Sequence, residues 1–157
     1  MFHVYQQSSV IPIIVDNGQF KILLVNNRSQ TRWIFPKGII ESELNAVESA
    51  QKEALEEAGI TGTVFNQPIG KYYYQKNDST HQVFVYIMIV DKILDKWPES
   101  GFRKRKYVNE QELLEILDDR IPYDMVDDML KTAKERIYKR DSKFQTLYKK
   151  IALKFNF

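Results

Sequence analysis

Apolar runs separated by turn residues divide the first part of the chain into predicted strands. Residues 10–15 and 20–25 are rich in Val, Ile and Leu, and each run predicts a strand. The Asp16-Asn17-Gly18 sequence between them predicts a tight hairpin, because Asn and Gly tolerate a positive φ. Pro12 has no backbone N–H to donate, so we expect the first strand at an edge of its sheet.

The pattern of short apolar runs continues further along the chain. A short strand is predicted at residues 33–35, and residues 61–64 and 71–75 are also expected to be extended. The polar residues Asn77-Asp78-Ser79 predict the next turn. Residues 81–90 form the most hydrophobic run, which predicts a strand in the centre of the sheet.

Helical spacing of apolar residues first occurs at residues 45–58. Asn45 with Glu48 forms an N-terminal capping pair, and Gly59 before the apolar Ile60 ends the helix. The apolar face is a narrow stripe that would let the helix approach a sheet closely, and it consists of Val47, Ala50, Ala54 and Ala58.

Three further helices are predicted in the second half of the chain. Asn109 caps a helix at about 110–117, and two more are expected at about 123–138 and 142–155. Strands and helices in this order, without a repeat or a linker, predict an α/β fold with a mixed sheet between helices. We expect one domain over residues 1–157, with a core at about 8–120 and a C-terminal helical extension at about 121–157.

Composition and charge narrow the functional classes. The 157 residues include no cysteine, which excludes disulfides, thiolate metal sites and cysteine nucleophiles. The first residues do not show the basic and apolar regions of a signal peptide, so we expect none, and the longest apolar run is far shorter than a membrane span. We therefore expect a cytoplasmic protein without a membrane partner. The net charge is +2, but Lys and Arg are concentrated after residue 130. That basic end either forms a solvated helix face or attracts polyanions. Because no RNA-binding motif is recognised, we do not predict a nucleic-acid module.

Glu53, Glu56 and Glu57 are the candidate chemical groups of the chain. On a helix, the spacings i, i+3 and i+4 place these carboxylates on one face. They lie near the helix C-terminus, whose dipole favours cations, so the three charges need a compensating positive charge. Mg²⁺ or Mn²⁺ would supply it through oxygen ligands, and the alternative is a solvated acidic face.

With their flanking residues, these glutamates resemble the signature of the Nudix family. Gly38, Glu53, Glu56, Glu57, Gly59 and Ile60 match that signature, the Nudix box, in register. Residues 33–38 further resemble Nudix enzymes that cleave dinucleoside polyphosphates and diphosphoinositol polyphosphates. Residues 81–90, followed by Trp97 and the basic run at 103–108, resemble the diphosphoinositol polyphosphate group. The resemblance covers about residues 8–120 and implies the α/β/α sandwich of that family, with C-terminal helices added.

Three positions depart from the family pattern. Leu44 stands where the first glutamate of the box is expected, and Glu41 or Glu43 is the candidate replacement. Lys52 stands where an arginine is expected, and it keeps the charge without the bidentate fork. Lys106 stands where many relatives carry a glutamate that assists the metal site, and a lysine there suits a phosphate instead.

The resemblance also implies the residues of the site. Glu53, Glu56 and Glu57 would be the catalytic carboxylates and, with the backbone carbonyl of Gly38, the ligands of Mg²⁺, with Mn²⁺ as the second candidate. Glu53 is either a ligand or the general base. Basic residues expected to hold the non-reacting phosphates are Lys37, Arg32, His81, Arg103 and Arg105. For His81, a structural role is the alternative.

These features together predict a Nudix pyrophosphohydrolase. Its substrate would be a phosphorylated small molecule of the diadenosine polyphosphate or diphosphoinositol polyphosphate type, cleaved at a phosphoanhydride bond. Two alternatives remain open. One is a housecleaning nucleotide or RNA 5′-end pyrophosphohydrolase, and the other is a catalytically idle Nudix scaffold that senses a ligand.

Overall fold

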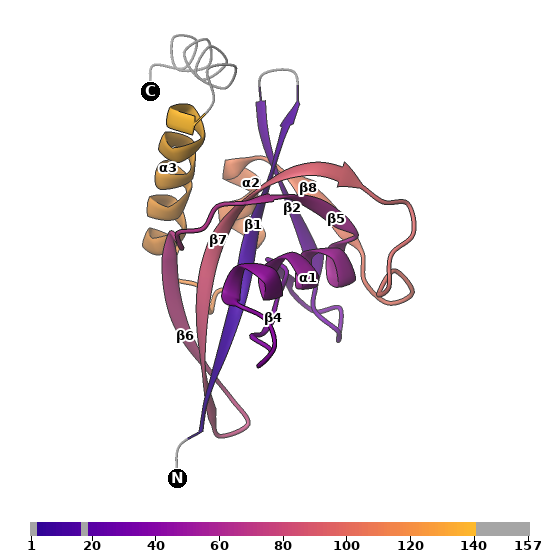
Figure 1. Cartoon of the computed structure of the whole chain (residues 1–157), viewed down its shortest axis with the longest axis vertical. Helices are drawn as coiled ribbons and strands as arrows, with labels where there is room; N and C mark the ends of the chain where they lie inside the picture. Colours follow the sequence, from indigo (N-terminus) through magenta and orange to yellow (C-terminus); the bar gives the residue numbers. More distant parts are fainter. Residues whose placement is uncertain (1–2, 17–18, 141–157) are drawn as a thin grey trace.

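The computed structural model describes residues 3–16 and 19–140, and in this part of the chain three layers are present (Figure 1). A mixed sheet of eight strands forms the middle layer of the described residues. Helix α1 (Ala46–Ala58) covers one face, and helices α2 (Glu110–Ile116) and α3 (Tyr123–Arg140) cover the other. The predicted α/β sandwich around a mixed sheet is therefore confirmed. The helix predicted at residues 142–155 lies outside the described residues.

Two long strands, β1 and β7, run parallel through the middle of the sheet. The order of the main path is β3-β2-β1-β7-β5, while β4 pairs with β1, β6 with β7 and β8 with β2. The strands are β1 (Val4–Asp16), β2 (Gln19–Asn26), β3 (Trp33–Ile34), β4 (Lys37–Ile39), β5 (Ile60–Val64), β6 (Gly70–Lys76), β7 (Ser79–Ile93) and β8 (Arg105–Val108).

Strand β1 lies inside the sheet, so the edge position expected from Pro12 is wrong. One side of β1 pairs with β7. The other side pairs with β4 at residues 7–9 and with β2 at residues 13–16. Pro12 lies between these two ladders, where the neighbouring strand changes. An interior strand tolerates the proline here because its missing N–H interrupts neither antiparallel ladder.

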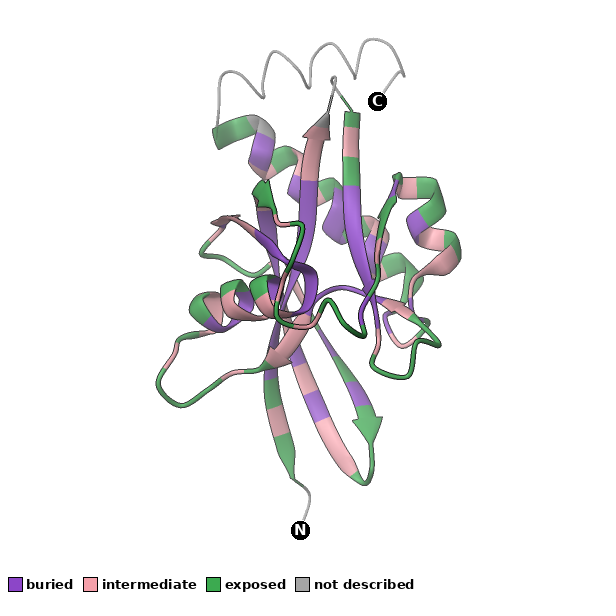
Figure 2. Ribbon diagram, turned by 90° about the vertical axis from the view of Figure 1, so that its right-hand side faces the viewer, coloured by how far each residue is buried: buried purple, intermediate pink, exposed green. Residues whose placement is uncertain are grey.

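Strand β7 holds the hydrophobic run at residues 81–90 and lies in the centre of the sheet, as predicted. Its side chains alternate between two cores. Val83 and Ile87 join the core beneath α2 and α3, whereas Tyr86 and Met88 join the core beneath α1. Figure 2 shows the buried positions gathered in the middle of the sheet, while the end of β1 near the N-terminus extends beyond it.

Helix α1 begins and ends as predicted. The Asn45 side chain accepts a hydrogen bond from the Glu48 N–H, and the Glu48 side chain accepts one from the Asn45 N–H. Gly59 ends the helix with a φ of 65°. The small residues of the apolar stripe are fully buried against the sheet, and they are Ala50, Ala54 and Ala58. The opposite face of α1 carries the glutamates.

The sequence predicts that Gly38 begins the loop to the helix at 45–58, whereas the structure places Gly38 in the short strand β4, paired with Ser8 of β1. The apolar pattern does not indicate this strand because it consists only of Lys37, Gly38 and Ile39. Its pairing with β1 fixes Gly38 beside α1, and the loop to the helix begins after it.

Both predicted hairpins have two-residue loops. The register pairs Asp16 with Gln19 and Lys76 with Ser79. Residues 17–18 lie outside the described part of the chain. Both residues of the second loop have a positive φ, at 49° and 62°, as a tight hairpin turn requires.

The helices after the sheet also agree with the sequence pattern. Asn109 accepts a hydrogen bond from the Glu112 N–H and caps α2, and α3 covers the range predicted from residue 123. Within the described residues, no helix has both the length and the apolar character needed to cross a membrane.

Candidate active site

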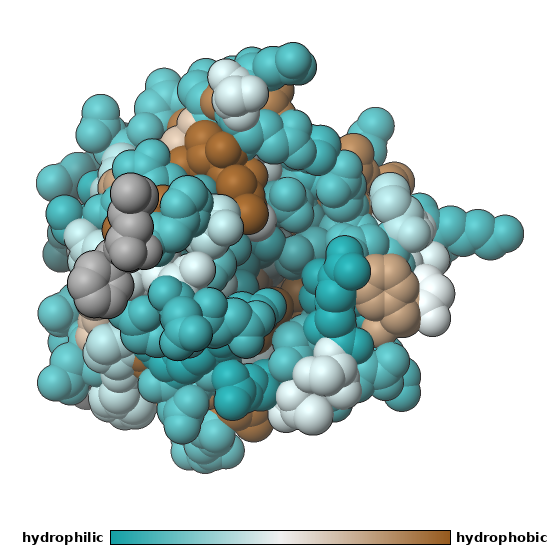
Figure 3. Space-filling model, turned by 90° about the horizontal axis from the view of Figure 1, so that it is seen from below, coloured by the Kyte–Doolittle hydropathy of each residue, from teal (hydrophilic) through white to brown (hydrophobic). Residues whose placement is uncertain are grey.

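A cleft of about 1180 Å³ lies where β4, α1, the loop between β2 and β3, and the β6–β7 hairpin meet. Figure 3 views the end of the molecule that carries the N-terminus, and this end is largely hydrophilic around a central hollow. The charged residues that line the cleft are Arg28, Arg32, Lys37, Glu41, Lys52, Glu53, Glu56, Glu57, Lys76, Glu99, Arg103 and Arg120. One cleft therefore contains both a group of carboxylates and a group of cations.

Glu57 of α1 is the most deeply buried carboxylate of the cleft. Its Oε2 accepts a hydrogen bond of 3.2 Å from the Lys37 N–H, and its Oε1 lies 3.3 Å from Nη2 of Arg103. Burial raises the pKa of Glu57 to about 8, although the charge of Arg103 acts in the opposite direction. The carboxyl group therefore titrates near neutral pH in the protein without a bound cation.

Glu53 lies directly against Gly38. A Cβ atom on Gly38 would overlap the carboxyl carbon Cδ of Glu53, so the close approach requires glycine. Burial raises the pKa of Glu53 to about 7, and the negative charge of Glu56 acts in the same direction. The match of Gly38 and Glu53 to the box thus corresponds to a physical contact between the two residues.

Glu56 and Lys52 lie at the more exposed side of the same helix face. Nζ of Lys52 lies 2.6 Å from Oε1 of Glu41 and 3.2 Å from Oε1 of Glu56. Of the two candidate replacements for the carboxylate missing at Leu44, Glu41 is therefore the one that pairs with Lys52. The altered half of the box therefore retains an ion pair.

Glu99 adds a further carboxylate to the cleft, beside those of α1 and Glu41, and the sequence analysis missed it. The residue lies in the loop between β7 and β8, and its Oε1 is 3.5 Å from Nη2 of Arg103 and 3.7 Å from Nη2 of Arg28. No recurrent spacing connects this loop to α1, so the sequence offers no signal for it. Lys106, at the position where many relatives carry a glutamate, lies outside the cleft lining, with its Nζ 5.5 Å from the centre of the Trp33 ring.

Cationic side chains from β4, the β2–β3 loop and the segment after α2 also line the cleft, and they include Lys37, Arg32 and Arg120. Burial lowers the pKa of Lys37, and the nearby positive charge of Arg120 acts in the same direction. Nε of Arg120 donates a hydrogen bond of 2.6 Å to Oδ2 of Asp118, and Arg32 lies 3.9 Å from the same carboxyl group. Asp118 thus holds two arginines at the cleft. The sequence analysis included Lys37 and Arg32 but missed Arg120.

His81 is stacked between two tyrosines, near the cationic side chains of Lys37 and Arg120. Its ring lies 4.7 Å from that of Tyr74 and 5.2 Å from that of Tyr5. Arg120 and Lys37 also lie over the Tyr74 ring, at 4.7 Å and 5.1 Å. Burial lowers the pKa of His81, as do these nearby cations, which favours the neutral imidazole. His81 borders the cleft mainly as part of an aromatic stack.

The two arginines predicted as phosphate ligands have different surroundings. Arg103 is buried in the cleft and is engaged by Glu57, Glu99 and the carbonyl of Asn26, at 2.7 Å. Arg105 is not part of the cleft lining. Its guanidinium lies 4.0 Å from the centre of the Trp97 ring and donates hydrogen bonds to backbone carbonyls.

The suitability of the site for a divalent cation follows from its donor set. Within the described residues, no three acidic or histidine side chains already converge on one point. Mg²⁺ does not require such a cage, because it is held by one or two carboxylates together with waters and substrate phosphates. Glu53, Glu56 and Glu57 on one helix face, with Glu99 beside them, supply hard oxygen donors of that kind. The residues present therefore suit Mg²⁺ or Mn²⁺.

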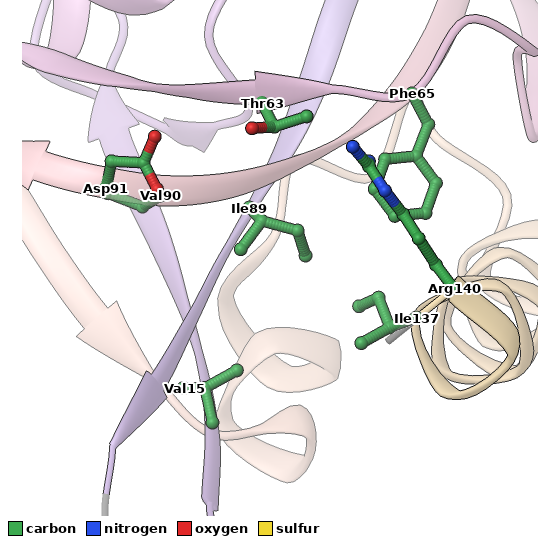
Figure 4. A pocket seen from close by; sticks show the side chains of 8 residues that line it. All are labelled: Val15, Thr63, Phe65, Ile89, Val90, Asp91, Ile137 and Arg140. Atoms are coloured by element: carbon green, nitrogen blue, oxygen red, sulfur yellow. The ribbon is translucent and has the colours of Figure 1, made fainter. Parts of the chain in front are cut away.

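A second hollow of about 350 Å³ lies away from the cleft, beside the end of α3 (Figure 4). Its floor is apolar, with Val15, Ile89 and Ile137 among the lining residues. Arg140 lies 4.7 Å from the centre of the Phe65 ring at its edge. Its lining contains the single carboxylate Asp91 and the single cation Arg140, so among the described residues the larger cleft is the better candidate for phosphate chemistry.

Comparisons with known proteins agree with the box residues. Residues 5–129 match the NUDIX domain. The chain is 32% identical over 102 residues to Nudix hydrolase 21, chloroplastic, of Arabidopsis thaliana, a match that covers 63% of this chain and 51% of that protein. It is 32% identical over 98 residues to diphosphoinositol polyphosphate phosphohydrolase 3-beta of Bos taurus, covering 61% of this chain and 58% of that protein. The chain thus spans about half the length of the curated relatives it matches.

Solved structures show the same fold. A C. elegans Ap4A hydrolase in a binary complex superposes with a TM-score of 0.66 at 15% identity, covering 82% of this chain and 96% of that chain. A NUDIX family hydrolase from Clostridium perfringens superposes with a TM-score of 0.63 at 21% identity, covering 80% and 95%. At these identities the likeness concerns the fold alone.

Proposed function

Since this chain belongs to the Nudix family, we propose that it hydrolyses a phosphoanhydride bond of a polyphosphorylated small molecule, with Mg²⁺ or Mn²⁺ as cofactor. The observation that supports this most strongly is the arrangement of the cleft. Carboxylates of α1 and cations from β4, the β2–β3 loop and the region of Arg120 line the same cleft. A phosphoanhydride needs both, because its charge must be neutralised and a water must lose a proton.

The carboxylates divide between cation binding and proton transfer. We assign Glu56, Glu57 and the carbonyl of Gly38 as cation ligands, with Glu53 as a further ligand or the general base. When bound, the divalent cation neutralises phosphate oxygens and lowers the pKa of a coordinated water. The pKa of Glu53, raised to about 7, suits a group that accepts a proton near neutral pH. Arg103 holds Glu57 in place through their ion pair.

The cationic side chains of the cleft favour a compact, highly phosphorylated substrate rather than a dinucleotide. Lys37, Arg32, Lys76 and Arg120 line the cleft together and can each contact a different phosphate. The aromatic side chains of the described lining, Tyr74 and His81, are already stacked on each other and contacted by cations. They leave no open ring pair for an adenine. We therefore favour a substrate of the diphosphoinositol polyphosphate type, the class named for the Bos taurus relative.

A substrate panel tests the proposed function. It would contain diphosphoinositol polyphosphates, diadenosine polyphosphates, ADP-ribose, nucleoside triphosphates and 5′-triphosphorylated RNA, each with Mg²⁺, with Mn²⁺ and with a chelator. We expect cation-dependent cleavage of a phosphoanhydride bond, fastest in diphosphoinositol polyphosphates, with the products of each substrate identified by chromatography. Faster cleavage of diadenosine polyphosphates or of RNA ends would contradict the preferred substrate class. Binding without any turnover would contradict the hydrolase and favour a sensor.

A further inference from the structure

The C-terminal end of α1 is completed by residues from a distant part of the chain. The last carbonyl groups of a helix have no partner within the helix. Here the carbonyl of Glu56 accepts a hydrogen bond of 3.1 Å from the Glu99 N–H. The carbonyl of Glu57 accepts one of 2.8 Å from Nε1 of Trp97, and that of Ala58 accepts one of 3.1 Å from Nη1 of Arg105. Three consecutive carbonyls thus depend on three residues between positions 97 and 105.

The side chains of Arg105 and Trp97 also contact each other. The guanidinium lies 4.0 Å from the centre of the indole ring, which is a close cation–π contact. Nη1 of Arg105 donates a second hydrogen bond, of 2.8 Å, to the carbonyl of Leu94, and the Leu94 N–H donates to the carbonyl of Gly59. A Cβ atom on Gly59 would lie 2.8 Å from Cβ and Cγ of Trp97. The glycine that ends the helix therefore also makes room for the indole.

Charge gives the arginine a second effect on the helix. The last turn of α1 contains Glu56 and Glu57 and no basic residue, whereas the dipole at this end favours a cation. The guanidinium of Arg105 supplies that cation from β8, directly at the terminal carbonyls. Arg105 thus stabilises a helix end that would otherwise be weakened by its own carboxylates.

The same contacts connect this helix end with the proposed chemistry. Glu56 and Glu57 supply both the carbonyls that are bound from outside and the carboxylates that face the cleft. Glu99 supplies both an N–H donor to this end and a carboxylate of the cleft. A change at Trp97 or Arg105 therefore shifts backbone and carboxylates together.

We propose that Trp97, Glu99 and Arg105 form a positioning clamp on α1, the α1 clamp, which sets the placement of Glu56, Glu57 and Glu99 for the bound divalent cation. Arg105 is in this account a positioning residue that does not touch the substrate. The proposal rests on the proposed function as far as catalysis is concerned, but its effect on cation binding is independent of which substrate is cleaved.

Mg²⁺ titration followed by the fluorescence of Trp97 tests the clamp without any substrate. The chain contains two tryptophans, so Trp33→Phe leaves Trp97 as the sole reporter. We expect Mg²⁺ to change the Trp97 emission in this variant, because the indole N–H is bound to the carbonyl of Glu57. In the Arg105→Ala form of the same variant, we expect at least about 10-fold weaker Mg²⁺ affinity. An unchanged emission in the first, or an unchanged affinity in the second, overturns the proposal.

Kinetics with the preferred substrate of the panel provide the second readout. Arg105→Ala should lower kcat on the order of 10- to 100-fold while KM stays within about 2-fold, because misplaced groups affect the chemical step most. Arg105→Lys should recover part of the loss, because an ammonium still donates to the helix carbonyls. Trp97→Phe, which keeps the ring and removes the N–H donor, should also lower kcat. Lys104→Ala is the matched control, because it removes an exposed positive charge one residue away, outside the cleft lining.

The outcomes separate the clamp from other roles. A raised KM with unchanged kcat in Arg105→Ala would mean that Arg105 contacts the substrate, which overturns the proposal. If folded Arg105→Ala has the kcat and the Mg²⁺ affinity of the wild type, Arg105 only caps the helix, and the proposal is also overturned. If the wild type cleaves nothing on the panel but the Mg²⁺ response depends on Arg105, the hydrolase fails and the clamp stands.

Discussion

Gly38 and Glu53 show how a single missing side chain determines the geometry of the cleft. The carboxyl group of Glu53 occupies the space where any other residue at position 38 would place its Cβ atom. Strand β4 cannot move away easily, because its pairing with Ser8 of β1 holds Gly38 in register. The glycine therefore acts through space on a carboxylate fifteen positions later in the chain.

Gly38→Ala should displace the Glu53 carboxylate from the cleft. We expect a loss of stability of less than about 1 kcal/mol, because the only atoms that must move belong to the end of the flexible Glu53 side chain. The same change should lower kcat on the order of 10²-fold, because Glu53 loses its position. Urea unfolding and steady-state kinetics would measure the two effects. Gly101→Ala is the matched control, since a Cβ atom there meets nothing within 4 Å. Equal behaviour of the two variants would contradict the contact.

Glu57 should make the stability of the protein without Mg²⁺ depend on pH. Its pKa rises from an ordinary value of 4.5 to about 8 on folding, so the folded state binds the proton more tightly than the unfolded state. This contribution to the free energy of unfolding is therefore greatest below pH 4.5 and is lost as pH rises to about 8. Mg²⁺ requires the ionised carboxylate, so its binding should release protons and offset the loss.

Comparison with Glu57→Gln isolates this contribution. Glutamine resembles the protonated carboxyl group at all pH values, so in chelator the variant should gain stability relative to the wild type as pH rises from 5.5 to 8.5. Urea unfolding at several pH values in that range would measure the difference. A constant difference, or one that shrinks with rising pH, would show that the pKa of Glu57 is not raised.

At the scale of elements, helix α1 controls where the carboxylates lie because it approaches the sheet closely. Ala50, Ala54 and Ala58 are fully buried against the strands, so the distance between helix and sheet is set by methyl groups. The capping box at Asn45 and the α1 clamp then fix the two ends of the helix. Packing against the sheet, capping at Asn45 and the hydrogen bonds of the α1 clamp together determine the placement of the three glutamates.

A larger residue in the alanine stripe should therefore disturb both stability and catalysis. We expect Ala54→Leu to lower the free energy of unfolding by about 1–3 kcal/mol, because the helix must move away from the sheet. Leu55→Ala, at an exposed neighbouring position, should cost less than about 1 kcal/mol. Thermal unfolding and phosphate release would measure both. If the two variants lose equally little stability and activity, the close packing of α1 does not position the site.

The sequence predicted the elements whose signals are local. The capping box at Asn45, the alanine stripe and the turn before Ser79 each occupy a few consecutive positions or one helical period. Strand β4 escaped prediction because its three residues exist as a strand only through pairing with β1. The interior place of β1 was mispredicted because Pro12 lies between two ladders, which no local pattern can indicate.

The candidate site was predictable only in part for the same reason. The glutamates of α1, Lys37 and Arg32 were identified from the box and its flanks, and the structure places all of them in one cleft. Glu99 and Arg120 reach that cleft from loops, and their positions carry no spacing signal. Arg105 was assigned to the substrate because it lies in a basic run, whereas the structure directs it to backbone carbonyls. The fold decides which member of such a run faces the site.

At the scale of the whole molecule, the sheet brings opposite charges to one end. The helix face with Glu53, Glu56 and Glu57 meets cations carried by β4, by the β2–β3 loop and by the β6–β7 hairpin, all of which lie at the same cleft. The central claim is that this arrangement hydrolyses a phosphoanhydride with the help of a divalent cation. Glu56 is the most suitable residue for a test, because its side chain is more exposed than that of Glu57, so its replacement disturbs the packing less.

The most direct test is the rate of phosphate release from a diphosphoinositol polyphosphate, measured by ³¹P NMR with Mg²⁺ present. The wild type and the control Glu43→Gln, which changes an exposed glutamate outside the cleft lining, should both release phosphate. Glu56→Gln, and the wild type in chelator, should be slower by on the order of 10²-fold or more. Release by Glu56→Gln at the wild-type rate, or release that persists in chelator, would contradict the account.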